Sequence, residues 1–110
     1  MIIVNHFYAL ENVSEATESE DTINISAESL IIQVDSNATN FSFQVLGQVD
    51  IHSEKFYALS GMNLDLERVN TIDKEGIYTF PIEGIGRFKI KLSQIDGGNI
   101  NVFCRMVKGA

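Results

Sequence analysis

The fold class is indicated by one stretch of the sequence, Phe41-Ser42-Phe43-Gln44-Val45-Leu46-Gly47-Gln48-Val49-Asp50-Ile51. Every second position from Phe41 onward carries an apolar residue or glycine. Successive side chains of a β-strand point to opposite faces of the sheet, so this alternation places one apolar face toward a core. The stretch therefore predicts a strand that runs to Ile51 and is buried on one side.

The same alternation recurs on both sides of this stretch, and turn-forming clusters separate the segments. The alternating apolar residues are Ile23 and Ile25; Leu30, Ile32 and Val34; Tyr78, Phe80 and Ile82; Phe88, Ile90 and Leu92; and Ile100, Val102, Cys104 and Met106. No window of helical length keeps an apolar period of about 3.6 residues. The sequence predicts an all-β fold: a single antiparallel β-sandwich, Ig-like or jelly-roll-like, with about seven to nine strands.

Three details of this sandwich follow from the pattern. Residues expected to face the core are Phe43, Val45, Phe80, Phe88, Ile90, Leu92, Ile100, Val102 and Cys104. A hairpin with a loop over 96–98 would pair Leu92 with Val102, because only that register puts both apolar faces on one side, and would leave Arg87, Lys89 and Lys91 on a solvated face. Pro81 cannot donate to a ladder, so its strand should be an edge strand or should bulge there.

Composition narrows the classes of partner. The 110 residues suit one domain, and the formal net charge is -7. Lys55 is the only base among residues 1–55, against nine acids, so no strongly positive surface is expected and nucleic acid is not an expected partner. The single cysteine indicates a chain that folds reduced, and no targeting signal or membrane-spanning run is visible, so no membrane partner is expected.

The N-terminal region differs from the rest. Residues 1–21 are predicted to be a terminal strand or arm followed by an acidic linker, and residues 22–110 the sandwich domain. The apolar residues of the arm that could dock on a neighbour are Ile2, Ile3, Val4, Phe7 and Tyr8. Two alternatives remain open: the arm lends a strand to another copy, or it folds back onto its own sheet.

No catalytic residues, metal ligands or cofactor are predicted. Asp50, His52 and Glu54 alternate, but ligands about 7 Å apart along one strand cannot surround an ion, so a solvated turn is the preferred interpretation. Cys104 lies in phase with an apolar face and is interpreted as a core residue rather than a nucleophile. No serine lies in a nucleophile-elbow pattern, so the protein is not expected to be an enzyme.

Aromatic residues outside the apolar phase are the clue to binding. Phe56 and Tyr57 are adjacent, so one of them must point away from the core if the strand is regular. Phe103 is out of phase with its neighbours Val102 and Cys104. Phe56, Tyr57 and Phe103 are therefore the candidate binding residues, for a protein contact or, as the alternative, for stacking on a sugar.

From about residue 41 to 107, the order of features resembles a small β-sandwich module of tailed-bacteriophage structural proteins. The similar segments are 41–50, ending in Gly-x-Val-Asp; Phe56-Tyr57-Ala58-Leu59; Gly76-Ile77-Tyr78-Thr79-Phe80; 87–92, which begins Arg-Phe; and Gly98-Asn99-Ile100-Asn101-Val102. The chain departs from the module at Asp50-Ile51-His52-Ser53-Glu54-Lys55-Phe56, where the module commonly has Asp-Gly-Thr-Asn-Trp. The motifs are scaffold residues, so the resemblance assigns no functional residue.

The resemblance implies a non-enzymatic virion component of the decoration or accessory type, which binds a repeating protein lattice in the head or tail. Its expected partners are other virion proteins and copies of itself. Its expected location is the virion, after synthesis in the cytoplasm of the host bacterium. The alternative is a carbohydrate-binding sandwich that attaches to a host glycan.

Overall fold

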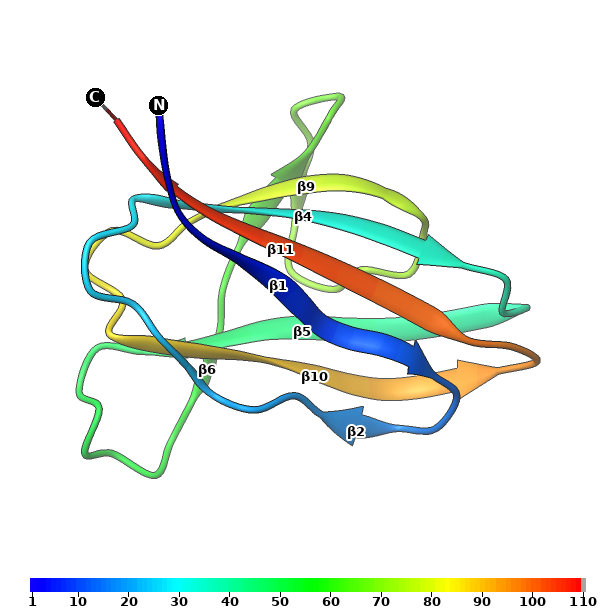
Figure 1. Cartoon of the computed structure of the whole chain (residues 1–110). Coiled ribbons are helices and arrows are strands. Elements are labelled where there is room, and N and C mark those ends of the chain that lie inside the picture. Colours follow the sequence, from blue (N-terminus) through cyan, green and yellow to red (C-terminus); the bar gives the residue numbers. More distant parts are fainter. Residues whose placement is uncertain (110) are drawn as a thin grey trace.

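The computed structural model describes residues 1–109, which form strands, turns and bends with no helix among them (Figure 1). The prediction of an all-β sandwich is confirmed. Eleven strands appear where about seven to nine were expected, because several are short pieces of two or three residues. No helix in the described part of the chain could cross a membrane.

The strands form two antiparallel sheets that face each other (Figure 1). One sheet has six strands in the order β1-β11-β4-β9-β7-β8, and the other has the order β2-β10-β5-β6 with β3 also paired to β10. The bounds are β1 Ile2–Val13, β2 Thr17–Glu18, β3 Thr22–Ile23, β4 Ser29–Ser36, β5 Asn40–Gln48, β6 Tyr57–Ala58, β7 Gly61–Asn63, β8 Arg68–Val69, β9 Gly76–Pro81, β10 Arg87–Asp96 and β11 Ile100–Lys108.

The alternation places the core between the two sheets. All nine residues expected to face it are buried, and Phe43, Val45 and Ile90 are fully so. The expectation that β5 reaches Ile51 is wrong, because the strand ends at Gln48. The chain then turns at Asp50, whose Oδ1 accepts a hydrogen bond from the His52 backbone N–H at 2.9 Å.

The predicted hairpin between β10 and β11 is also wrong. β10 pairs with β5, whereas β11 pairs with β1 and β4, so residues 97–99 connect one sheet to the other. Leu92 lies opposite Phe43, and Val102 lies opposite Val34 and Leu10. The apolar faces of β10 and β11 still point into one core, but from opposite sheets. The parity of residue numbers is the same for a hairpin and for two strands in facing sheets, so it cannot distinguish them.

The strand that contains Pro81 is not an edge strand. β9 lies between β4 and β7. Pro81 is its last residue, opposite Ser29 of β4, while the pairing with β7 involves Tyr78 and Thr79. The missing N–H is tolerated because the strand ends there.

The N-terminal region belongs to both sheets. β1 folds back and pairs with β11 of the same chain, so the two termini lie close together in Figure 1. Leu10 of β1 is buried in the core. The acidic segment after β1 runs along β10 through β2 and β3, so residues 1–21 cover one side of the sandwich instead of extending away from it.

Candidate functional site

An apolar surface lies on the outer side of the six-stranded sheet. The register places Tyr8 beside Phe103, Phe103 beside Gln33, and Gln33 beside Ile77. The adjacent row runs through Arg105, Ile31, Thr79 and Met62. We call the outward apolar residues of these two rows the aromatic face: Tyr8, Ile31, Met62, Ile77 and Phe103.

The aromatic face is partly open to solvent. Tyr8 is 54% exposed and Met62 47% exposed, while Phe103 is half-buried. The rings of Tyr8 and Phe103 meet edge to face, with centroids 5.1 Å apart and planes inclined at 70°. This geometry is favourable between the two rings but does not form the flat platform on which a sugar stacks.

The side chains of Arg105 and His6 lie beside the aromatic face. Arg105 is exposed and pairs in register with His6, whose ring centroid lies 6.0 Å from that of Phe103. The chain as a whole is acidic, with a net charge of -7. A partner surface that combines apolar residues with carboxylates would complement this face.

Phe56 lies just before β6 and is not a free binding aromatic, because basic side chains of β10 lie over its ring. The Lys89 Nζ lies 4.3 Å and the Arg87 Cζ 5.4 Å from the centre of its ring, which is cation–π geometry. Lys89 also pairs with Glu18 at 2.6 Å, and Arg87 pairs with Asp21 at 3.2 Å. Of the basic row of β10, expected on a solvated face, Arg87 and Lys89 are thus partly covered by the Phe56 ring and the acidic segment, whereas Lys91 is exposed as expected.

Lys89 also perturbs the carboxylate that it contacts. Its hydrogen bond and its positive charge lower the pKa of Glu18 below the ordinary value of 4.5. Glu18 is exposed, so the pair is a surface contact that holds β2 on β10 rather than a catalytic arrangement.

The loop before Phe56 is fixed by Gln48, a polar side chain that is only 4% exposed. Its Nε2 donates hydrogen bonds to the carbonyls of Ser53 at 3.0 Å and Lys55 at 2.9 Å. Its Oε1 accepts one from Arg87 Nε at 2.7 Å. Tyr57 follows this loop and is 66% exposed, so of the two adjacent aromatics it is Tyr57 that reaches into solvent.

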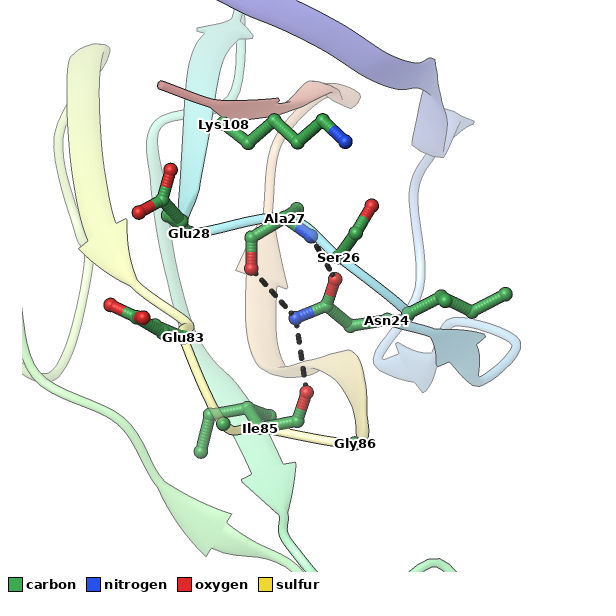
Figure 2. Close-up of a pocket in the computed structure, with 10 residues that line it drawn as sticks. Asn24, Ser26, Ala27, Glu28, Glu83, Ile85, Gly86 and Lys108 are labelled. Carbon is green, nitrogen blue, oxygen red and sulfur yellow. Dashed lines mark hydrogen bonds between the residues drawn. The ribbon is translucent and has the colours of Figure 1, made fainter. Parts of the chain in front are cut away.

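An open depression of about 520 Å³ lies at one end of the sandwich (Figure 2). The Asn24 side chain stands at its wall and donates to the carbonyls of Ala27, Ile82 and Ile85. Its Oδ1 accepts from the Ala27 N–H at 2.9 Å. Both polar atoms of this amide are therefore used to hold the 24–28 segment on the 82–86 loop, and its role is structural.

Residues with potential chemistry are not brought together. Burial raises the pKa of Cys104 to about 12, so the thiolate that a nucleophile requires does not form at ordinary pH. Asp50, His52 and Glu54 are exposed in and beside a turn, as the sequence indicated. Among residues 1–109, no three His, Cys, Asp or Glu side chains are grouped so that they could hold a metal ion.

Sequence reasoning identified Phe103 and Tyr8 but did not bring them together. The sequence places Tyr8 in the arm and groups Phe103 with Phe56 and Tyr57, which lie just before and in β6 of the opposite sheet. Sequence reasoning does not identify Ile31, Met62 and Ile77. Ile31 and Ile77 are out of phase with buried neighbours on their own strands, which is the signal that could have placed them on an outer face. Only the order of the strands shows that these residues share one surface.

The Ile2, Ile3 and Val4 side chains of the arm are all partly exposed, whereas Phe7 packs partly against the core. In the structure of the single chain, the arm folds back and pairs with β11 of its own sheet, which is the second of the two alternatives. The accessible parts of the arm are therefore the outer edge of β1 and the Tyr8 side chain, which belongs to the aromatic face.

No protein-family model matches this sequence. No curated protein matches it either. Two solved structures share the fold. The SPBc2 prophage-derived protein YomS is 19% identical with a TM-score of 0.86, and the match covers 98% of this chain and 96% of YomS. The PBSX exported protein XepA is 19% identical with a TM-score of 0.87, and the match covers 94% of this chain but 37% of XepA. The chain thus has the fold of two prophage proteins, over the whole of one and about a third of the other.

Proposed function

We propose that this protein is a non-enzymatic structural component of a tailed-bacteriophage particle, of the decoration or accessory type, which docks on a repeating protein lattice. The observation that carries the proposal is the similarity in fold to YomS over nearly the full length of both chains. The segments that resemble a virion module agree with it. The protein would be made in the bacterial cytoplasm and function in the virion.

The aromatic face is the proposed docking surface. It lies on a rigid sheet, so its side chains are held in place before a partner binds, which reduces the entropic cost of association. Tyr8 and Phe103 would be its main anchors, since aromatic residues are enriched among the residues that contribute most to affinity. Arg105 and His6 would select a lattice protein with carboxylates at the rim of its site.

The proposal can be tested with phage particles that lack the protein. Purified wild-type protein should co-sediment with such particles and saturate at a fixed number of copies. The double variant Tyr8→Lys/Phe103→Lys should lose most of this binding, because it replaces both aromatic anchors of the face with charged side chains. The matched control is Val49→Lys, which changes a 73% exposed residue just after β5 of the other sheet and should bind normally.

Failure of the wild-type protein to bind particles would refute the proposal. Equal binding by the double variant and the control would refute the aromatic face as the docking surface. Binding to a glycan array that is lost in Tyr57→Ala would instead support the carbohydrate-binding alternative, because Tyr57 is the exposed member of the aromatic pair.

A further inference from the structure

The outer edge of β1 is an unpaired edge of the six-stranded sheet. β1 spans Ile2–Val13 and pairs with β11 on one side. Within residues 1–109, no strand pairs with its other side. An open strand edge presents a row of free N–H and C=O groups that can pair with another strand.

The other edge strands are short. The opposite edge of the same sheet is β8, which has two residues and includes Arg68. The edges of the second sheet are β2, β3 and β6, also of two residues each. β1, with twelve residues, is the long edge of the described structure.

β1 carries few of the features that protect an edge strand from pairing. Residues 1–10 contain no proline, lysine, arginine, aspartate or glutamate. Irregularities between Ile3 and Asn5 and between Tyr8 and Leu10 interrupt the ladder with β11, but Asn5–Tyr8 between them is regular. Ile2, Ile3, Val4 and Tyr8 are 38–54% exposed. Natural proteins normally place charge or proline on such an edge when it must stay free.

We propose that the free edge of β1 pairs antiparallel with β1 of a second copy, with Asn5–Tyr8 at the centre of the contact. An antiparallel pair of identical strands is self-complementary, as a two-fold contact requires. It brings no two carboxylates together, although the chain carries a net charge of -7, because residues 1–10 are uncharged. A second copy is therefore an occupant whose charge and shape both fit.

This pairing would join the six-stranded sheets of two copies into one continuous sheet. A two-fold axis perpendicular to the sheet keeps both aromatic faces on the same side. The pair would then present two copies of Tyr8, Phe103 and Ile31 on one surface. The proposal differs from strand exchange, because each β1 remains on its own β11 and uses only its outer edge.

Sedimentation velocity over a range of protein concentrations tests the proposal. Wild-type protein should form a dimer. The variant Ile3→Lys/Val4→Lys should raise the dissociation constant about tenfold, because lysines on an edge strand oppose its pairing with another strand. Leu64→Lys is the matched control and should dimerise as the wild type does. Circular dichroism melts should show that both variants remain folded.

A disulfide lock distinguishes edge pairing from exchange. In a Cys104→Ser background, Tyr8→Cys/Phe103→Cys places two thiols at opposite positions of β1 and β11. Edge pairing predicts a bond within one chain on a non-reducing gel and a dimer that persists after locking. Bonds between chains would establish exchange and overturn the proposal.

Hydrogen exchange provides a measurement that needs no variant. Dilution of the wild-type dimer should speed exchange at outward amides of Asn5–Tyr8 and leave the amides of β4 unchanged. A wild-type protein that is monomeric at its highest soluble concentration overturns the proposal. A dimer that is unaffected by the two lysines also overturns it.

Discussion

Replacing Gln48 with methionine tests how the loop that carries Phe56 and Tyr57 is held. Gln48 makes three hydrogen bonds with lengths of 2.7–3.0 Å while being 4% exposed. Methionine keeps the length and the volume of the side chain but can make none of these bonds. Two backbone carbonyls and the Arg87 Nε would then lose their partner.

The expected loss of stability can be worked out from these contacts. Three hydrogen bonds at about 1 kcal/mol each give about 3 kcal/mol. Burial of the more apolar methionine side chain offsets about 1 kcal/mol of this. The net loss of about 2 kcal/mol corresponds to a fall in Tm of roughly 8 °C for a domain of this size.

Urea unfolding and thermal melts of Gln48→Met measure this loss. The control is Gln44→Met on the same strand, where the half-buried amide makes one long contact of 3.5 Å with Thr71. The control should change the free energy of unfolding by less than about 0.5 kcal/mol. If the two variants lose equal stability, the reasoning that Gln48 fixes the loop is wrong.

Three further predictions concern the arm, the acidic segment and the cysteine. In urea titrations, Leu10→Ala should lower the free energy of unfolding by about 3 kcal/mol, because the Leu10 side chain is buried. Ile3 is half-exposed, so Ile3→Ala should lower it by less than about 0.5 kcal/mol. Equal effects would mean that β1 does not contribute to the core. Lys89 lowers the pKa of Glu18, so the stabilising contribution of this carboxylate is present above pH 4.5 and is lost as the pH falls through the lowered value. Glu18→Gln should therefore speed exchange of the Ser19 amide, measured by NMR, near pH 7, and its difference from the wild type should shrink as the pH falls below 4.5; a difference that grows at lower pH would contradict this. Iodoacetamide should label Cys104 at about pH 8 only after unfolding, because burial raises the pKa of the thiol, and rapid labelling of the folded protein would contradict its position in the core.

The sheet class and the core could be predicted because they depend on local alternation. Phe43, Ile90 and Val102 are each in phase with apolar neighbours two residues away, and all are buried. The partner of each strand could not be predicted in the same way. A short glycine-containing loop suits either a hairpin or a connection between sheets, and here contacts of β11 with β4, far away in sequence, determine the result.

The surfaces were harder to predict for the same reason. Tyr8 and Phe103 are 95 residues apart and meet only because β1 pairs with β11. Phe56 has the sequence pattern of an exposed aromatic, but Arg87 and Lys89 lie over its ring. The acidic segment has the composition of a free linker, yet its charges pair with the basic row of β10. In each case contacts between distant segments outweigh local composition.

The proposal that the protein is a structural component of the virion can be tested by quantitative mass spectrometry of gradient-purified phage particles. The protein should remain with the particles through purification and should be present at a fixed ratio to the major capsid or tail protein. A protein that is abundant in infected cells but absent from purified particles would contradict the account.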